Sequence, residues 1–340
     1  MKQEKEYQHI LITGGAGYLG SMLCGHLLRM GYAVTVVDDL LYGGESLLSY
    51  QSHPDFRFVK VNVCDPRSIH SAVDHHMPIP GVIVHLAGIV GFPACQAVGR
   101  HVAWRYNVEA TQRVYEQGLE LGAERFIYAS TYSAYGASRG DQPATEQSTL
   151  NPQSLYAETV VGAEKFLLTQ CDTACKPVIF RMAHLYALSP RPRFDLIINQ
   201  FVWEAYRNRE LLIYQRGYSR SFMHIEDAVR GLVLGIENKI ERVGNQVYNL
   251  GSESGNLSKD KIVEIILKRL PETRVIYKDL TFGGDMRDFH ISYTKIRENL
   301  DFEVLKTVED GVREVLHALR SGIIADPQDQ RYRNARFIVS

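Results

Sequence analysis

The chain has 340 residues, a length that suits one large α/β unit or two modest domains around a sizeable core. With 45% hydrophobic and 23% charged residues, its composition excludes a largely disordered protein. The net charge is −1 and basic residues are interspersed with acidic ones, which disfavours nucleic acids and anionic membranes as partners.

The five cysteines lie at irregular spacing, which indicates reduced thiols rather than a disulfide framework and therefore a cytoplasmic location. Cys171 and Cys175 lie four residues apart, but no matching pair of His or Cys completes a tetrahedral site, so we expect no metal. The polar N-terminus, Met1 to His9, lacks the apolar stretch of a secretory signal, and no apolar run reaches membrane-spanning length.

Short apolar runs alternate with longer amphipathic segments through the first half of the chain. In order, they are residues 9–13, 19–30, 33–37, 56–61, 82–86 and 126–130. This alternation predicts strands connected by helices, and unbroken Val and Ile runs are typical of parallel strands buried on both faces. We therefore expect an α/β protein with a Rossmann-type, doubly wound parallel sheet.

Beyond about Arg181 the pattern loosens into loops, aromatic clusters and separate helices, including residues 262–270 and 308–319. We expect a Rossmann domain over residues 1–182 and a smaller C-terminal α/β lobe over 183–325, with segments that return to the first domain. Residues 326–340 are rich in Arg, Asn and Gln and are expected to form a poorly ordered tail.

A glycine-rich turn follows the first predicted strand. Gly14, Gly17 and Gly20 are spaced three residues apart where the first helix begins. Glycine permits the tight turn and a close approach of the backbone to a pyrophosphate, and the helix N-terminus favours the anion. The strand, turn and helix together therefore predict a dinucleotide site.

The second predicted strand ends in Asp38 and Asp39, about twenty residues after the turn. A carboxylate at this position accepts hydrogen bonds from the ribose 2′-hydroxyl and repels a 2′-phosphate. Because no Arg follows nearby, the sequence predicts NAD rather than NADP as the cofactor.

Several motifs together resemble the extended short-chain dehydrogenase/reductases, the group that contains UDP-galactose 4-epimerase. They are the glycine turn, residues 85–88, Asn107, residues 130–136, Tyr156 and residues 220–227, and the resemblance spans roughly residues 10–319. Residues 180–196 are similar to a branch that includes a bacterial GDP-heptose 4-dehydrogenase. The resemblance implies an NAD-dependent enzyme acting on a UDP-, GDP- or dTDP-linked sugar, and a homodimer formed through helices of the first domain. Apolar residues such as Trp104, Tyr115 and Leu167 supply material for that interface or for the core.

The resemblance also implies which residues bind the cofactor. Asn62 would lie near the adenine, and the backbone of Ala87 and Gly88 would line the cofactor; the alternative for each is packing at a strand end. The expected cofactor-binding residues are Gly14, Gly17, Tyr18, Leu19, Gly20, Asp38, Asp39, Asn62, Val63, Leu86, Ala87, Gly88, Asn107 and Tyr156.

Tyr156, at the start of a predicted helix, is the candidate base. A tyrosinate can take the proton of a sugar hydroxyl if its pKa falls from about 10 toward neutrality. Family members carry a Lys one turn later to stabilise the phenolate, but this chain has Val160. Lys165 cannot replace it, because nine helical residues turn it to the opposite face.

Three explanations for Val160 stay open. Another cation fills the place, the positive nicotinamide ring alone supports the chemistry, or catalysis is slow or lost.

Thr131 is the second catalytic candidate, since relatives carry a Ser or Thr there that hydrogen-bonds the reacting hydroxyl. Two residues later, related 4,6-dehydratases and decarboxylases carry an acidic residue and 3,5-epimerases a Cys, whereas this chain has Ser133. A serine is poorly matched to abstracting a carbon-bound proton, which favours oxidation at carbon 4 without dehydration.

Guanidinium groups suit the diphosphate of a nucleotide sugar, and Arg220 and Arg287 stand where relatives bind phosphate. Arg193, with Arg191 in a stiff Pro-containing loop, is a further candidate for contact with sugar or phosphate. His184 replaces an Asn usual in the epimerases, and with Thr131 it completes the expected substrate-binding set.

The sequence thus favours a nucleotide-sugar 4-epimerase or 4-dehydrogenase. The alternative, motivated by Val160, is a protein that binds NAD and a nucleotide sugar as a sensor or assembly partner with weak or no catalysis.

Overall fold

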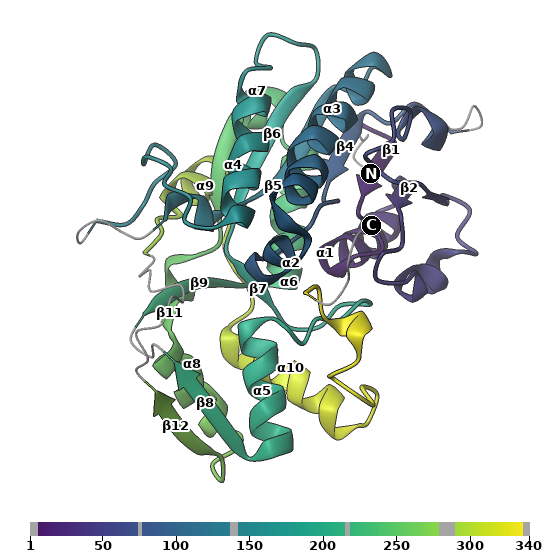
Figure 1. Ribbon diagram of the computed structural model, residues 1–340. Coiled ribbons are helices and arrows are strands. Elements are labelled where there is room, and N and C mark those ends of the chain that lie inside the picture. The colour runs from purple at the N-terminus through teal and green to yellow at the C-terminus, as the bar shows by residue number, and fades with distance from the viewer. Residues whose placement is uncertain (1–5, 74–76, 137–141, 215–217, 279–289, 336–340) are drawn as a thin grey trace.

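The computed structural model describes residues 6–73, 77–136, 142–214, 218–278 and 290–335, and every structural statement below refers to these. Its main strands are β1 (His9–Thr13), β2 (Ala33–Asp38), β3 (Phe56–Lys60), β4 (Val82–His85), β5 (Arg125–Thr131), β6 (Lys176–Met182) and β10 (Gln246–Leu250). In the described residues these seven strands form one sheet, in the order β10-β6-β5-β4-β1-β2-β3 (Figure 1). Every pairing in it is parallel, which confirms the predicted doubly wound sheet.

Helices cover both faces of this sheet (Figure 1). They are α1 (Tyr18–Arg29) and α6 (Ile225–Glu237) on one face, and α2 (Phe92–Trp104), α3 (Ala110–Glu120) and α4 (Leu155–Leu168) on the other. The faces follow the two-residue period of a strand. Ile10 and Ile12 of β1 pack in one buried cluster with Leu23 of α1, whereas Leu11 packs in the other with Val114 of α3.

The smaller lobe follows β6 in the chain and has its own apolar core. Its helices are α5 (Ile197–Asn208), α8 (Lys259–Leu267) and α10 (Val308–Arg320), and its strands are β7 (His184–Tyr186), β8 (Glu210–Tyr214), β9 (Ser219–His224), β11 (Asn256–Ser258) and β12 (Arg274–Lys278). Strand β8 pairs with β12, and β9 pairs with both β7 and β11. Two short helices, α7 (Ile240–Val243) and α9 (Thr294–Leu300), lie next to β10. They belong to the segments that bring the chain back to the Rossmann sheet.

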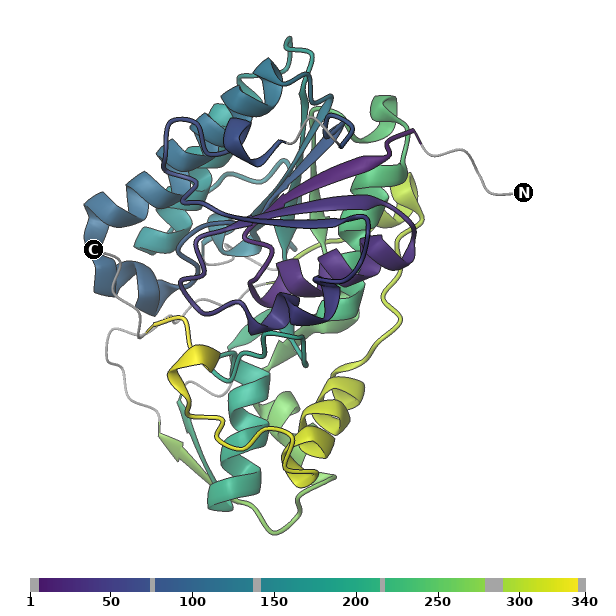
Figure 2. The same ribbon diagram turned by 90° about the vertical axis from the view of Figure 1, so that its right-hand side faces the viewer.

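The end of the chain, expected to be a poorly ordered tail, lies against the rest of the molecule over residues 330–335. After α10 it runs back toward the Rossmann domain (Figure 2) and forms a short 3₁₀ turn, η6 (Gln330–Tyr332). Asn334, which follows, is buried. Partners far away in the sequence hold this segment, including Phe194, Asp195 and Arg191.

The apolar residues expected to form a dimer interface are mostly internal. Tyr115 and Leu167 are buried in the core, whereas Trp104, at the end of α2, keeps 37% of its surface exposed. Among the described residues, no helix is both long and apolar enough to cross a membrane.

The topology determines where a ligand binds. Strand β1 leads into α1 on one face and β4 leads into α2 on the other, so the chain diverges between these neighbouring strands. In open parallel sheets a crevice forms at the carboxyl ends of strands at such a switch point.

Candidate active site

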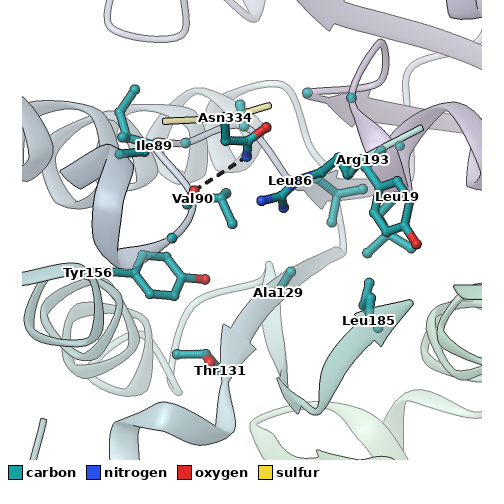
Figure 3. A pocket seen from close by; sticks show the side chains of 18 of the residues that line it. Leu19, Leu86, Ile89, Val90, Ala129, Thr131, Tyr156, Leu185, Arg193 and Asn334 are labelled. Atoms are coloured by element: carbon teal, nitrogen blue, oxygen red, sulfur yellow. Dashed lines mark hydrogen bonds between the residues drawn. The ribbon is translucent and has the colours of Figure 1, made fainter. Parts of the chain in front are cut away.

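A cavity of about 520 Å³ occupies this switch point and extends to the smaller lobe. Its wall combines the glycine turn, the ends of β2, β4 and β5, the start of α4, and the segment from Met182 to Ile197. Tyr156 and Thr131 point into it from one side, and Arg193 lies across from them (Figure 3).

The glycine turn forms the cavity wall beside α1. Gly14 has a φ of 71°, and a Cβ there would lie 2.6 Å from the backbone nitrogen of Ala87. A Cβ on Gly20 would collide with the Gly14 carbonyl, so both positions require glycine. Gly17 precedes α1 with no side chain capping it, which leaves the N–H groups of the first turn available to an anion.

Asp38 lies at the end of β2 beside this turn. Its Oδ2 accepts a hydrogen bond from the Ala16 nitrogen at 3.0 Å, and its Oδ1 accepts one from the Leu40 nitrogen at 2.8 Å. Burial raises the pKa of the Asp38 carboxyl to about 6, although both backbone hydrogen bonds lower it. The bare turn, the uncapped helix and this carboxylate at the cavity wall fit the diphosphate and ribose of a dinucleotide.

The opposite wall follows β4. Residues 86–88 line the cavity, whereas Asn107 is buried behind them and holds the loop that follows. The Asn107 Oδ1 accepts a hydrogen bond from the Ile89 nitrogen at 2.7 Å, and its Nδ2 donates to the Thr159 hydroxyl at 2.9 Å. Val63 also lines the cavity, but the Asn62 amide is used by Tyr106 and Cys64 and is not part of the lining.

Tyr156 is placed by the first turn of α4. Ser154 caps this helix by accepting a hydrogen bond from the Ala157 nitrogen at 3.2 Å, and the phenol of Tyr156 projects into the cavity. Burial raises the pKa of Tyr156 above its ordinary range, and the nearby Arg193 guanidinium opposes that shift. Val160 is buried among apolar residues one turn later, while Lys165 is exposed.

Thr131, the last residue of β5, lies beside Tyr156. Its hydroxyl oxygen accepts a hydrogen bond from the Ser133 nitrogen at 3.2 Å. Directly before it, the Ser130 hydroxyl donates to Glu164, which forms a buried ion pair with Arg181. The ion pair, which the sequence did not reveal, holds β6 against α4, and the Ser130 hydrogen bond adds the end of β5.

The predicted substrate-binding residues are only partly brought together. His184 and Arg193 line the cavity, and the Arg193 guanidinium donates to both carboxylate oxygens of Asp195 at 2.9 Å. Arg220 is buried in β9 and does not belong to the lining. Arg287 lies outside the described residues.

Sequence reasoning missed part of the wall. Tyr42, which follows β2, and Asn334 and Ala335 from the C-terminal segment also line the cavity. The Asn334 Nδ2 donates to the Val90 carbonyl at 3.4 Å (Figure 3). A tail without hydrophobic periodicity gave no local signal of this position.

Comparison with known proteins identifies relatives across almost the whole chain. An uncharacterized UDP-glucose epimerase of Bacillus subtilis, YtcB, is 27% identical and aligns with 92% of this chain and 98% of its own length. A dTDP-glucose 4,6-dehydratase of an Actinoplanes strain is 29% identical, covering 90% of this chain and 96% of that protein.

Solved structures share the fold. The UDP-glucose 4-epimerase of Thermotoga maritima superimposes with a TM-score of 0.81 at 24% identity, covering 93% of this chain and 99% of that one. The dTDP-glucose 4,6-dehydratase DesIV of Streptomyces venezuelae, solved with NAD bound, gives a TM-score of 0.80 at 25% identity, with 92% and 98% covered. Residues 10–251 match the NAD dependent epimerase/dehydratase family. The chain therefore belongs to this family, which confirms the predicted cofactor, NAD, and the resemblance to the extended short-chain dehydrogenase/reductases.

Proposed function

We propose that this protein uses NAD to oxidise a nucleotide-linked sugar at carbon 4, as a 4-epimerase or a 4-dehydrogenase. The observation that carries the proposal is the shared cavity, since Tyr156, Thr131, the glycine turn and Asp38 all line it. A base, a hydroxyl and a dinucleotide site in one cavity can remove a proton and a hydride from the same carbinol.

NAD, when bound, supplies the hydride acceptor. Gly14, Gly17 and Gly20 would hold its diphosphate, and Asp38 would accept hydrogen bonds from a ribose. Tyr156 takes the proton of the sugar hydroxyl at its phenolic oxygen. Thr131 orients that hydroxyl, because its own hydroxyl can both donate and accept.

The proton transfer requires a lower phenol pKa than burial alone allows. Arg193 is the nearby cation that lowers the pKa of Tyr156, and we assign it part of the role that a lysine at position 160 would have. Its ion pair with Asp195 weakens that effect, and the positive charge of a bound oxidised nicotinamide would supply the rest.

The substrate is a UDP-, GDP- or dTDP-linked sugar whose sugar lies near His184 and Arg193. The relatives include an uncharacterized UDP-glucose epimerase and dTDP-glucose 4,6-dehydratases. Ser133 lines the cavity where an acid or base for dehydration would stand, and this favours oxidation at carbon 4 without loss of water. We assign Arg220 and Arg287 to the nucleotide diphosphate, although Arg220 lies outside this lining.

A second candidate function rests on a specific observation. Val160 is buried and apolar, and burial raises the pKa of Tyr156, so the phenol is a poor base until a ligand changes its surroundings. A protein with this site can bind NAD and a nucleotide sugar without turning it over, as a sensor or assembly partner.

Absorbance of the bound cofactor distinguishes these functions. The purified protein is mixed with a panel of UDP-, GDP- and dTDP-sugars, and products are identified by NMR, because a 4-epimer has the same mass as its substrate. Sugar oxidation predicts a rise in reduced nicotinamide, which Tyr156→Phe abolishes and Tyr206→Phe, an exposed control on α5, leaves unchanged. Sugar binding in calorimetry without any redox change or product would instead support the sensor function.

A further inference from the structure

The C-terminal segment, residues 329–335, connects the two parts of the molecule beside the cavity. On the side of the smaller lobe, the Tyr332 carbonyl accepts a hydrogen bond from the Phe194 nitrogen at 3.0 Å. The Asn334 nitrogen donates to Asp195 at 2.9 Å. On the Rossmann side, the Asn334 carbonyl accepts a hydrogen bond from the Tyr42 hydroxyl at 3.3 Å. The segment therefore closes one edge of the cofactor cavity.

Arg191 is held underneath this segment. Its Nε donates to the Arg331 carbonyl at 3.1 Å, and its Nη1 donates to Asn334 Oδ1 at 2.7 Å. The guanidinium carbon lies 4.3 Å from the centre of the Tyr42 ring, within the range of a cation–π interaction. Three contacts thus fix the position of the side chain.

One donor of this buried guanidinium is unused. Arg191 is 6% exposed, and its Nη2 has no hydrogen-bond partner within the described part of the chain. Leaving a buried charged donor unpaired is costly, so such a group in a ligand cavity indicates a missing acceptor. Burial lowers the pKa of Arg191 to about 10, and the group remains charged at neutral pH.

An anion at the Asp38 end of the cavity would supply this acceptor. Arg191 lines the cavity and is close enough to Asp38 to lower the pKa of that carboxyl. The N-terminus of α1, at the glycine turn, belongs to the same cavity wall. A diphosphate next to a ribose on Asp38 would therefore have the helix N-terminus and a guanidinium as partners.

We propose that Arg191, held by Asn334 and Tyr42, donates from Nη2 to the diphosphate of bound NAD, and that residues 329–335 form a clamp that retains the cofactor. The proposal rests on the dinucleotide lying at the glycine turn and not on the sugar chemistry. A protein that retains its cofactor must return the hydride to the oxidised sugar or pass it to a second carbonyl compound. The clamp therefore favours those two outcomes over exchange of the cofactor at every turnover.

Binding of three ligands to protein freed of copurified dinucleotide tests the clamp. Isothermal titration with NAD, ADP and adenosine compares the unaltered protein with Arg191→Met and Arg191→Lys. Arg191→Met is expected to weaken NAD and ADP at least tenfold, as for a lost charge-assisted hydrogen bond, and to leave adenosine unchanged. The affinities of Arg191→Lys for NAD and ADP are expected to lie between those of the unaltered protein and those of Arg191→Met. Lysine keeps the positive charge but lacks the paired donors of a guanidinium group.

The rate at which NAD dissociates tests the role of the segment itself. Asn334→Ala is expected to speed dissociation several-fold, because it releases Nη1 of Arg191. Arg274→Ala is the control, since its exposed side chain pairs with Glu210 and lies outside both the segment and the cavity lining. It should stay within about twofold of the unaltered protein, as expected for surface pairs.

Two results would overturn the clamp. One is an Arg191→Met protein, folded by its thermal transition, whose NAD affinity stays within twofold of the unaltered protein. The other is an equal loss for adenosine, which would make Arg191 a structural residue. Because no sugar is present, either result is independent of whether Tyr156 oxidises one.

Discussion

The affinity for NAD should depend on pH through Asp38. Burial raises the pKa of this carboxyl to about 6, so it is protonated below that pH and ionised above it. Only the ionised form can accept hydrogen bonds from both ribose hydroxyls, and NAD therefore binds to the deprotonated state. The affinity should be constant above pH 7 and fall as the pH drops through 6.

The size of the effect follows from one proton. With a pKa of about 6, ionised Asp38 is about ten times less abundant at pH 5 than at pH 7, so the Kd for NAD should rise about tenfold. Fluorescence titration between pH 5 and pH 8, with a thermal melt at each pH to confirm folding, measures it.

Two variants make this test specific. Asp38→Asn cannot ionise and should bind NAD more weakly with no inflection near pH 6. Asp39→Asn keeps Asp38 but removes a neighbouring negative charge that raises its pKa, so the inflection should persist at a slightly lower pH. A flat profile for the unaltered protein, or an unchanged inflection in Asp38→Asn, would refute the reasoning.

Three further perturbations test other parts of the structure. Val160→Lys is expected to raise kcat and to move the inflection of the pH–rate profile to lower pH, because a cation one turn from Tyr156 stabilises the phenolate. Val160→Met should have neither effect, and equal effects of the two variants would contradict this reasoning. Glu164→Gln is expected to lower the free energy of unfolding in urea by about 3–5 kcal/mol, because it leaves Arg181 buried without its partner, and the double variant with Arg181→Met should recover part of the loss. A loss below about 1 kcal/mol would show that the pair contributes little. From the resemblance we propose a homodimer through helices of the first domain. Trp104→Glu, at the partly exposed end of α2, should then shift the sedimentation coefficient to that of a monomer, and an unchanged value would place the interface elsewhere.

Local patterns in the sequence were sufficient to predict the Rossmann half. The strand and helix around the glycine turn have bounds close to those expected, 9–13 for β1 and Tyr18–Arg29 for α1. Hydrophobic runs and glycine spacing determine structure over a few residues, and few other local structures are compatible with glycines at this spacing. The same reasoning put Asp38 at the cavity wall.

Contacts between distant residues could not be predicted in this way. Arg191 and Asn334 are 143 residues apart, and Tyr42 and Asn334 are 292 apart. No spacing rule relates such partners, and a polar tail has no periodicity to reveal its packing. Arg220 illustrates the converse, because its position in the motif pointed to the substrate although β9 buries it away from the described cavity lining.

The central claim is that NAD lies along the glycine turn with its nicotinamide facing the Tyr156 phenol. A crystal structure of the NAD complex tests it most directly. We predict the diphosphate at Gly14 to Gly20, the adenosine ribose on Asp38, and the nicotinamide ring beside Tyr156 and Thr131. A dinucleotide bound elsewhere, or a nicotinamide directed away from the phenol, would contradict it.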